Sequence, residues 1–239
     1  MARPSRRRTR PARAPPGTTR HRDIVPAPKN DGVPGNLRWL RWVKRLQAIA
    51  QDGLTYTEDG YDVGRYEQLR EIAAEMLAAH STGELDEARR LLQLQVGPAT
   101  PKVDVRAAVF DGDGILLIKE PDDGGWSLPG GWADVGESPA EAIAREVYEE
   151  SGYRVRVTRL LSAYDRDRHG HPPNLYHVYK LNFLCEILDH DPSVAVEADG
   201  TGFFAADAIP PLSLPRVTPA QIERFFEHHR DPNLPADFD

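Results

Sequence analysis

The 239-residue chain has a single cysteine, Cys185, which excludes an internal disulfide framework and is typical of a reducing cytoplasm. Cys185 lies in the apolar stretch LNFLCEIL (181–188), where we expect a buried strand thiol rather than a nucleophile. No apolar run approaches the roughly 18 residues that a membrane span needs. The basic start of the chain has no apolar segment behind it, so we do not expect an export signal. These features favour a cytoplasmic protein with no membrane partner.

The P-loop signature and a basic body, two features of phosphate-binding proteins, are also missing. No GxxxxGK[ST] segment is present, which excludes P-loop chemistry. The whole chain has a net charge of −7, but residues 1–34 carry nine Lys or Arg against two Asp, which leaves −14 for the rest. An acidic body disfavours a broad phosphate-binding face, so a nucleic-acid partner is not expected. The Pro and Arg content of residues 1–34 predicts a disordered basic tail.

Apolar residues between positions 35 and 96 recur at helical spacing. Three helices are expected: one over 36–51 that Asp52-Gly53 ends, one over about 63–80, and one that opens with a capping box of Ser81 and Glu84. We expect them to form a small all-α domain over 35–96. The first helix is apolar on more than one face, which indicates a further partner, and we expect a homodimer through these helices.

The periodicity changes after the linker signal GPATP (97–101). Strand-like runs follow at 104–110, 114–120, 153–164, 175–188 and 202–206, and the first two surround a hairpin signature, Asp111-Gly112-Asp113. One helix is expected to begin at Ser138 and end at Gly152, and another to run from Thr218 to near His229. This mixture predicts an α+β domain over 102–230, followed by a C-terminal tail over 231–239.

Three carboxylates gather on the helix that begins at Ser138. Glu146, Glu149 and Glu150 stand at i, i+3 and i+4, so they share one face, and they occupy the last turn, where the helix dipole is negative. Each repulsive contribution is about 0.3–1 kcal/mol, and Arg145 alone cannot neutralise three charges. Carboxylate oxygens are hard ligands, so the pattern implies Mg²⁺, or Mn²⁺, rather than Zn²⁺. A bare ExxEE would be better explained as a solvated acidic face.

The residues around these carboxylates exclude that simpler explanation. From Gly131 the chain runs Gly, five residues, Glu137, seven residues, Arg145-Glu146, an apolar residue, any residue, Glu149-Glu150, any residue, Gly152 and an apolar residue. Seven specified positions in register have a chance on the order of one in a million at ordinary residue frequencies. This segment, 131–153, resembles the box of the Nudix hydrolase family at every position.

The resemblance implies a Nudix-type α/β/α sandwich with a mixed sheet. It implies that Glu146, Glu149 and Glu150 hold Mg²⁺ together with the backbone carbonyl of Gly130, while Glu137 and Arg145 brace the loop against the helix. The general base is open between Glu150 and Glu197, which follows the box on a loop and is in a suitable place for this role. Glu149 and Glu150 are the expected catalytic carboxylates of the box.

Wider similarity points to a narrower group, the hydrolases of X-linked nucleoside diphosphates that carry a helical N-terminal domain. It rests on segments 53–73, 128–142, 164–173 and 202–213, and covers roughly 38–228. The implied substrate is a small nucleotide such as CDP-choline or ADP-ribose. His169 and His171 in the loop RDRHGHPP either contact the substrate or pack the loop, and Trp132 either stacks on the substrate or packs as core. Arg166 and Arg168 alternate with Asp165 and Asp167, so we expect little net charge there for a triphosphate.

Two other functions share this fold in the same family. A ligand-sensing regulator that binds DNA would typically have lost box carboxylates, whereas this box is whole, and the N-terminal helices show no basic recognition helix. An RNA end-processing hydrolase would use the same box, but the acidic body argues against a long RNA footprint. A hydrolase of a small nucleotide is therefore the favoured hypothesis.

Overall fold

The computed structural model describes residues 37–193 and 198–239. The expected basic tail, 1–34, lies outside the described residues. Three helices come first, α1 (Arg38–Tyr56), α2 (Gly60–His80) and α3 (Leu85–Gln93). Their shared core consists of side chains from all three helices, namely Val43, Ala73, Ala74, Leu77, Ala88 and Leu92. The expected small helical domain is confirmed.

Two helix ends differ from the sequence expectation. Helix α1 continues past Gly53 to Tyr56, because Gly53 serves close packing rather than helix termination. A Cβ atom at Gly53 would lie 2.4 Å from the ring of Tyr66 on α2. The expected capping box of Ser81 and Glu84 is wrong: α3 begins at Leu85, and the Ser81 hydroxyl instead accepts a bond from the Gly83 amide at 3.3 Å.

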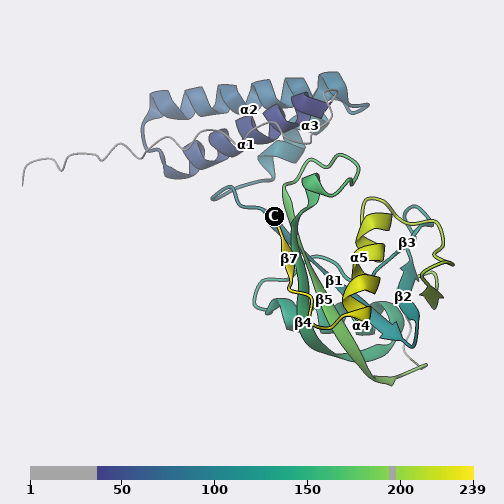
Figure 1. Cartoon of the computed structure of the whole chain (residues 1–239). Coiled ribbons are helices and arrows are strands. Elements are labelled where there is room, and N and C mark those ends of the chain that lie inside the picture. Colours follow the sequence, from purple (N-terminus) through teal and green to yellow (C-terminus); the bar gives the residue numbers. More distant parts are fainter. Residues whose placement is uncertain (1–36, 194–197) are drawn as a thin grey trace, which may run out of the picture. The chain divides into compact units, whose positions relative to one another are not determined.

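The rest of the described chain forms a mixed sheet in the order β3-β2-β1-β5-β4-β7, with β6 paired to β2 (Figure 1). Its strands are β1 (Lys102–Asp111), β2 (Gly114–Lys119), β3 (Trp126–Ser127), β4 (Tyr153–Asp165), β5 (Val178–His190), β6 (Thr201–Ala205) and β7 (Asp237–Phe238). Strand β1 is parallel to β5 and β4 is parallel to β7, whereas the other pairs are antiparallel. The expected hairpin is confirmed by the pairing of Asp111 with Gly114.

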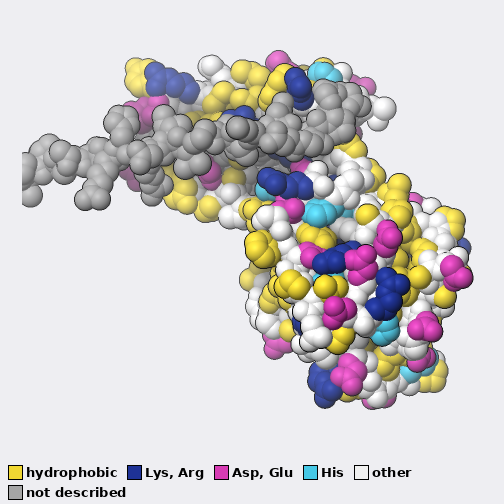
Figure 2. Space-filling model, in the orientation of Figure 1, with side chains coloured by type: hydrophobic (Ala, Val, Ile, Leu, Met, Phe, Trp, Pro, Cys, Tyr) yellow, Lys and Arg dark blue, Asp and Glu magenta, His cyan; other side chains and the backbone are white. Residues whose placement is uncertain are grey.

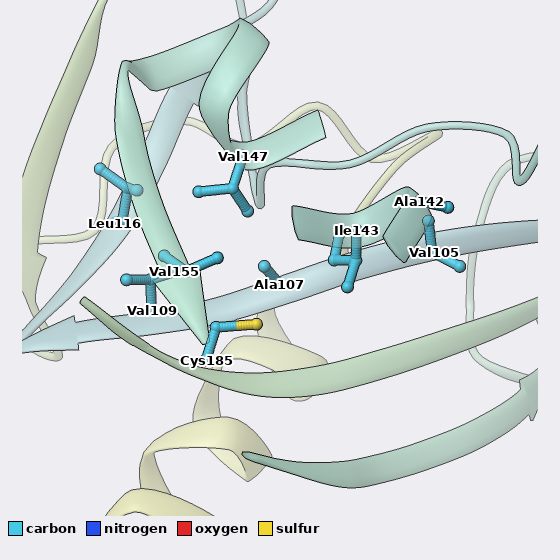
Figure 3. Packing of buried hydrophobic residues seen from close by; sticks show 9 residues of the cluster. All are labelled: Val105, Ala107, Val109, Leu116, Ala142, Ile143, Val147, Val155 and Cys185. Atoms are coloured by element: carbon cyan, nitrogen blue, oxygen red, sulfur yellow. The ribbon is translucent and has the colours of Figure 1, made fainter. Parts of the chain in front are cut away.

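Helices α4 (Pro139–Ser151) and α5 (Pro219–Arg230) cover opposite faces of the sheet. Alternation along β1 explains this arrangement, since successive strand residues point to opposite faces. The odd residues Val105, Ala107 and Val109 pack with α4, and Ala108 packs with α5. Figure 3 shows the first of these cores, with Ala142, Ile143 and Val147 of α4 against β1. The α/β/α sandwich is therefore confirmed.

Cys185 belongs to the same core (Figure 3). Its thiol is buried, and this burial raises its pKa to about 12. A thiol that stays protonated at neutral pH is a poor nucleophile. The expectation of a structural thiol is confirmed.

The last residues of the chain take part in the sheet, although we expected a tail over 231–239. Residues Asp237–Phe238 form β7 beside β4. Arg224 of α5 donates two bonds of 2.7 Å to the Asp237 carboxylate, and His228 contacts it at 3.0 Å. The C-terminus therefore ties α5 to the edge of the sheet. Within residues 37–193 and 198–239, no helix is long and apolar enough to cross a membrane.

Candidate active site

The loop before α4 runs alongside the first half of β1. Ala107 N donates to Pro129 O at 2.9 Å, and Val105 N donates to Gly131 O at 2.8 Å. Gly130 lies between these two bonds at a φ of +140°, where a Cβ atom would be 2.0 Å from the Val105 carbonyl oxygen. Only glycine allows the loop to approach β1 this closely.

Helix α4 presents its carboxylates to this loop. Its start is fixed by the expected capping box of Ser138 and Glu141 with Pro139 at the first helical position, and Gly152 ends it with a φ of +74°. Gly130 N donates to Glu150 Oε2 at 2.7 Å. A Cβ atom on Gly131 would lie 3.0 Å from Glu146 Oε1. Gly131 thus leaves room for the Glu146 carboxylate, and the Gly130 amide holds that of Glu150.

Arg145 braces the loop against the helix, as the resemblance implied. It donates to both carboxylate oxygens of Glu137, at 3.0 to 3.2 Å. It also donates to Glu146 at 3.1 Å and to Glu149 at 2.8 Å. One guanidinium thus donates hydrogen bonds to three carboxylates, and Glu150 is not one of these three. The carboxylate of Glu149 is turned toward Arg145 and is 42% exposed.

Burial makes the charged forms of Glu146 and Glu150 costly. Desolvation raises the pKa of Glu150 to about 7, opposed by the charge of Arg106 and by the Gly130 hydrogen bond. Desolvation also raises the pKa of Glu146, opposed by Arg145. A neighbouring carboxylate raises each pKa further: Glu146 raises that of Glu150, and Glu149 raises that of Glu146. Clustered, partly buried carboxylates of this kind fit a hard divalent cation.

The potential metal ligands are not arranged as a complete metal site. Among the residues that the structure describes, no three His, Cys, Asp or Glu side chains are grouped as a metal site. Glu146 and Glu150 already face the Gly130-Gly131 backbone, whereas Glu149 is held by Arg145. A third carboxylate ligand would therefore require Glu149 to exchange its bond with Arg145 for the cation.

The other expected site residues are dispersed. Glu197 lies outside the described residues. Trp132 is half exposed and pairs with Asp104 of β1 in an isolated bridge. His169 stacks on Tyr164, and its Nε2 atom lies 3.1 Å from the Asp239 carboxylate, so its described contacts are within the C-terminal edge. His171 is turned inward, and its Nδ1 donates to the Leu214 carbonyl at 2.8 Å.

Sequence reasoning missed a set of buried charges beside the carboxylates. Arg106 donates to both oxygens of Asp104 at 3.0 and 3.1 Å, and Lys180 of β5 donates to Asp104 at 2.7 Å. Arg106 also donates to the Leu128 carbonyl, and its charge acts on Glu150. The available signal was the alternation of charges in DVR (104–106) within an otherwise apolar strand, where a buried charge needs a partner.

Comparison with known proteins gives consistent results over most of the chain. Residues 100–225 match the NUDIX domain, and residues 37–92 match a domain described as UDP-X-like, N-terminal oligomerisation domain. A putative ADP-ribose pyrophosphatase of Bacillus subtilis is 43% identical over 202 residues, which cover 84% of this chain and 97% of the relative.

Two solved structures are also similar. The crystal structure of a UDP-X diphosphatase is 34% identical and superposes with a TM-score of 0.55, covering 85% of this chain and 99% of the other. An ADP-ribose pyrophosphatase from Streptococcus suis is 38% identical with a TM-score of 0.54, covering 59% of this chain and all of the other.

Proposed function

This chain belongs to the Nudix hydrolase family, and from that premise we propose that it cleaves the pyrophosphate bond of a nucleoside diphosphate linked to a second group X. The reaction would use Mg²⁺, or Mn²⁺ as an alternative, and its substrate would be of the CDP-choline or ADP-ribose type. The names of two relatives, a putative ADP-ribose pyrophosphatase of Bacillus and an ADP-ribose pyrophosphatase of Streptococcus, support this class.

The observation that carries the proposal is the pair of carboxylates at the Gly130-Gly131 turn. Glu146 and Glu150 would hold the metal together with Glu149 and the Gly130 carbonyl. When bound, the metal neutralises pyrophosphate oxygens and makes a bound water more nucleophilic. Arg145 and Glu137 hold the loop on the helix beside the carboxylates.

One carboxylate must accept the proton of the attacking water. Glu150 and Glu197 are the two candidates. Replacing each with Gln and measuring kcat against pH separates them, because loss of the base removes the acidic limb of the profile as well as lowering kcat. Full activity of both variants would contradict a carboxylate base at either position.

The base of the nucleotide and the group X are to be identified by direct assay. A hydrolysis screen over CDP-choline, ADP-ribose, a UDP-sugar, NADH and nucleoside triphosphates, with and without Mg²⁺, tests the proposal. We expect turnover of at least one X-linked diphosphate that stops when EDTA removes the metal. Hydrolysis restricted to triphosphates would contradict the proposed substrate class, and turnover in EDTA would contradict the metal.

We also propose that two copies of this chain form a homodimer through helices α1 to α3. Trp42, Ile49 and Tyr56 are 52%, 50% and 72% exposed and follow one another at intervals of seven along α1. A seven-residue interval keeps side chains on one side of a helix, as in helix-helix seams. Figure 2 shows apolar side chains at the surface of these helices, among charged ones. The match to an N-terminal oligomerisation domain supports this assembly.

A further inference from the structure

A group of buried cations lies on the side of β1 opposite α4. Asp104 and Arg106 occupy even positions of β1, the same side as Ala108, and Asp104 pairs in register with Lys180 of β5. The side chains of Lys180 and Arg106 are 2% and 6% exposed. Both donate to the single carboxylate of Asp104.

Arg166 adds a third buried cation. It lies in the 3₁₀ helix Arg166–Arg168 that follows β4, and its side chain is 4% exposed. Within the described residues, its hydrogen bonds go to backbone carbonyls, at 2.8 Å to Pro172 and at 3.2 and 3.4 Å to Pro215. Asp167 lies 4.0 Å away, beyond hydrogen-bond distance. Burial lowers the pKa of Arg166, as expected when a cation is desolvated without a bonded carboxylate.

In the described part of the chain, His171 has an unpaired hydrogen-bond acceptor near Arg166 and Lys180. Its Nδ1 donates to the Leu214 carbonyl, next to the Pro215 carbonyl that Arg166 uses. Its Nε2 is buried and has no hydrogen-bond partner among the described residues. The ring is close enough to Lys180 and Arg166 for both charges to act on it. Because its Nδ1 hydrogen is given to Leu214, the neutral ring can only accept a hydrogen bond at Nε2, so it would bond a hydroxyl or another donor group of a ligand that the cations attract.

The buried cations have few hydrogen-bonded carboxylates. Arg106 and Lys180 share Asp104, and the hydrogen bonds of Arg166 go to backbone carbonyls. Glu120 lies 3.9 Å from Arg106, but it is bonded to Arg216 at 2.9 Å and to Ser127. Buried charge without compensation is costly, so an anion that enters the group would be stabilised.

We propose that Arg166 and Lys180 form a subsite for a phosphoryl group of the substrate, with His171 accepting a hydrogen bond from a donor group of the same ligand, and that this subsite is distinct from the α4 carboxylates that the proposed function assigns to the metal. Arg106 interacts with both the subsite and the α4 carboxylates, because it is bonded to Asp104 and its charge acts on Glu150. A ligand phosphate would take over the donors that Arg166 now gives to Pro172 and Pro215. Planar guanidinium groups bind phosphoryl oxygens well through paired donors. The subsite rests on the proposed function for its ligand class.

The test measures binding of inorganic phosphate to the metal-free full-length protein. Thermal melts are recorded in EDTA with phosphate or with chloride at equal ionic strength, so neither metal binding nor hydrolysis contributes. We expect phosphate to raise the Tm of the wild type by roughly 2–4 °C at concentrations well above Kd, because a ligand that binds only the folded state stabilises it. Arg166→Gln and Lys180→Gln should each lose that shift.

Arg168→Gln is the matched control. Arg168 stands two residues from Arg166 in the same short helix, but its side chain is 58% exposed and faces Asp165. This variant should keep the full shift. If Arg166→Gln does not fold, Lys180→Gln decides alone. A wild type without a phosphate shift, or a shift kept by Lys180→Gln, overturns the subsite and leaves the metal-dependent hydrolysis of the α4 site untouched.

Discussion

The backbone amide of Gly130 donates a 2.7 Å hydrogen bond to the Glu150 carboxylate, which follows it by 20 residues. The bond joins the loop along β1 to the last turn of α4. Two costs oppose this position of Glu150, burial and the negative end of the helix dipole, and one amide donor offsets part of them. The loop conformation and the carboxylate position therefore depend on each other.

The first prediction concerns that loop. Gly130→Ala should lower the free energy of unfolding through positive-φ strain and through a contact of 2.0 Å with the Val105 carbonyl. Each effect costs about 1–3 kcal/mol. Gly136→Ala is the control, because Gly136 has a φ of +101° but nothing within 4 Å of an added Cβ. Urea unfolding measures the free energy of unfolding of both variants. Equal losses in the two variants would show that the close approach to β1 does not constrain the loop.

The second prediction concerns the carboxylates of α4. Glu149→Gln and Glu150→Gln should each lower kcat by roughly 10²–10⁴. Without metal, their thermal stability should be unchanged or higher, because the repulsion between clustered carboxylates is relieved. Steady-state assays in Mg²⁺ and melts in EDTA provide the two readouts.

The control for these variants is Glu186→Gln. Glu186 is an exposed carboxylate on β5 that pairs with Arg156, so its loss should leave kcat at the wild-type value. If Glu149→Gln and Glu150→Gln both keep full activity in Mg²⁺, the metal site is not on this helix.

Helix α4 shows what the sequence could predict. Its limits follow from local chemistry within a few residues, namely the capping box of Ser138 and Glu141 and the left-handed Gly152. The pairing of Glu137 with Arg145 spans eight residues along the same segment. The sandwich followed from the resemblance, and the strand β1 from its β-like run over 104–110.

Contacts between residues far apart in the chain could not be predicted from the sequence. Asp104 and Lys180 are 76 residues apart, and no local pattern links them. The alternating charges of 165–168 predicted cancellation, but the short helix turns Arg166 inward and leaves Arg168 exposed. The strand β7 has two residues, too few for a periodic signal.

The third prediction concerns the C-terminal edge. Arg224, followed by His228 and Tyr164, holds the pKa of Asp237 well below its usual value of 3.8. A depressed carboxylate pKa adds stability that is present above about pH 4 and lost as the pH falls through the folded pKa. Asp237→Asn should therefore be less stable at pH 7 by about 1.5–3 kcal/mol, a range typical of hydrogen bonds to a charged group.

The difference between Asp237→Asn and the wild type should shrink as the pH falls from 4 toward 2. Urea unfolding at several pH values measures it. The exposed Asp207 provides the control, since Asp207→Asn should follow the wild type at every pH. A difference in unfolding free energy that stays constant over this pH range would show that the charge of Asp237 does not contribute to stability.

The fourth prediction concerns assembly. Ile49→Lys places a charge in the middle of the exposed apolar row on α1 and should convert a dimer to a chain of 26.7 kDa. Light scattering at micromolar concentration measures the mass. Val96→Lys is the control, because Val96 is 81% exposed and lies beyond α3. A wild type that is already monomeric would contradict the dimer.

The last prediction concerns substrate choice. X-linked nucleoside diphosphates such as CDP-choline or ADP-ribose should be cleaved with a higher kcat/KM than nucleoside triphosphates. A triphosphate brings additional negative charge, which needs cations that are not already engaged. Arg145, the cation beside the α4 carboxylates, is already bonded to Glu137 and Glu149. Figure 2 shows acidic side chains beside basic ones over the visible face of the sheet domain, an arrangement that weakens long-range attraction of a polyanion.

The comparison is made at equal free Mg²⁺ with CDP-choline, ADP-ribose and the four common dNTPs. A triphosphate advantage above roughly tenfold, which corresponds to about 1.4 kcal/mol of transition-state binding, would overturn the substrate class. His171→Ala should raise KM for the preferred substrate and leave kcat nearly unchanged, because it removes a contact made equally in the ground and transition states. Arg168→Gln should leave both constants at wild-type values, since that side chain points away from the buried group. An unchanged KM in His171→Ala would show that this imidazole packs the loop against Leu214 without touching the substrate.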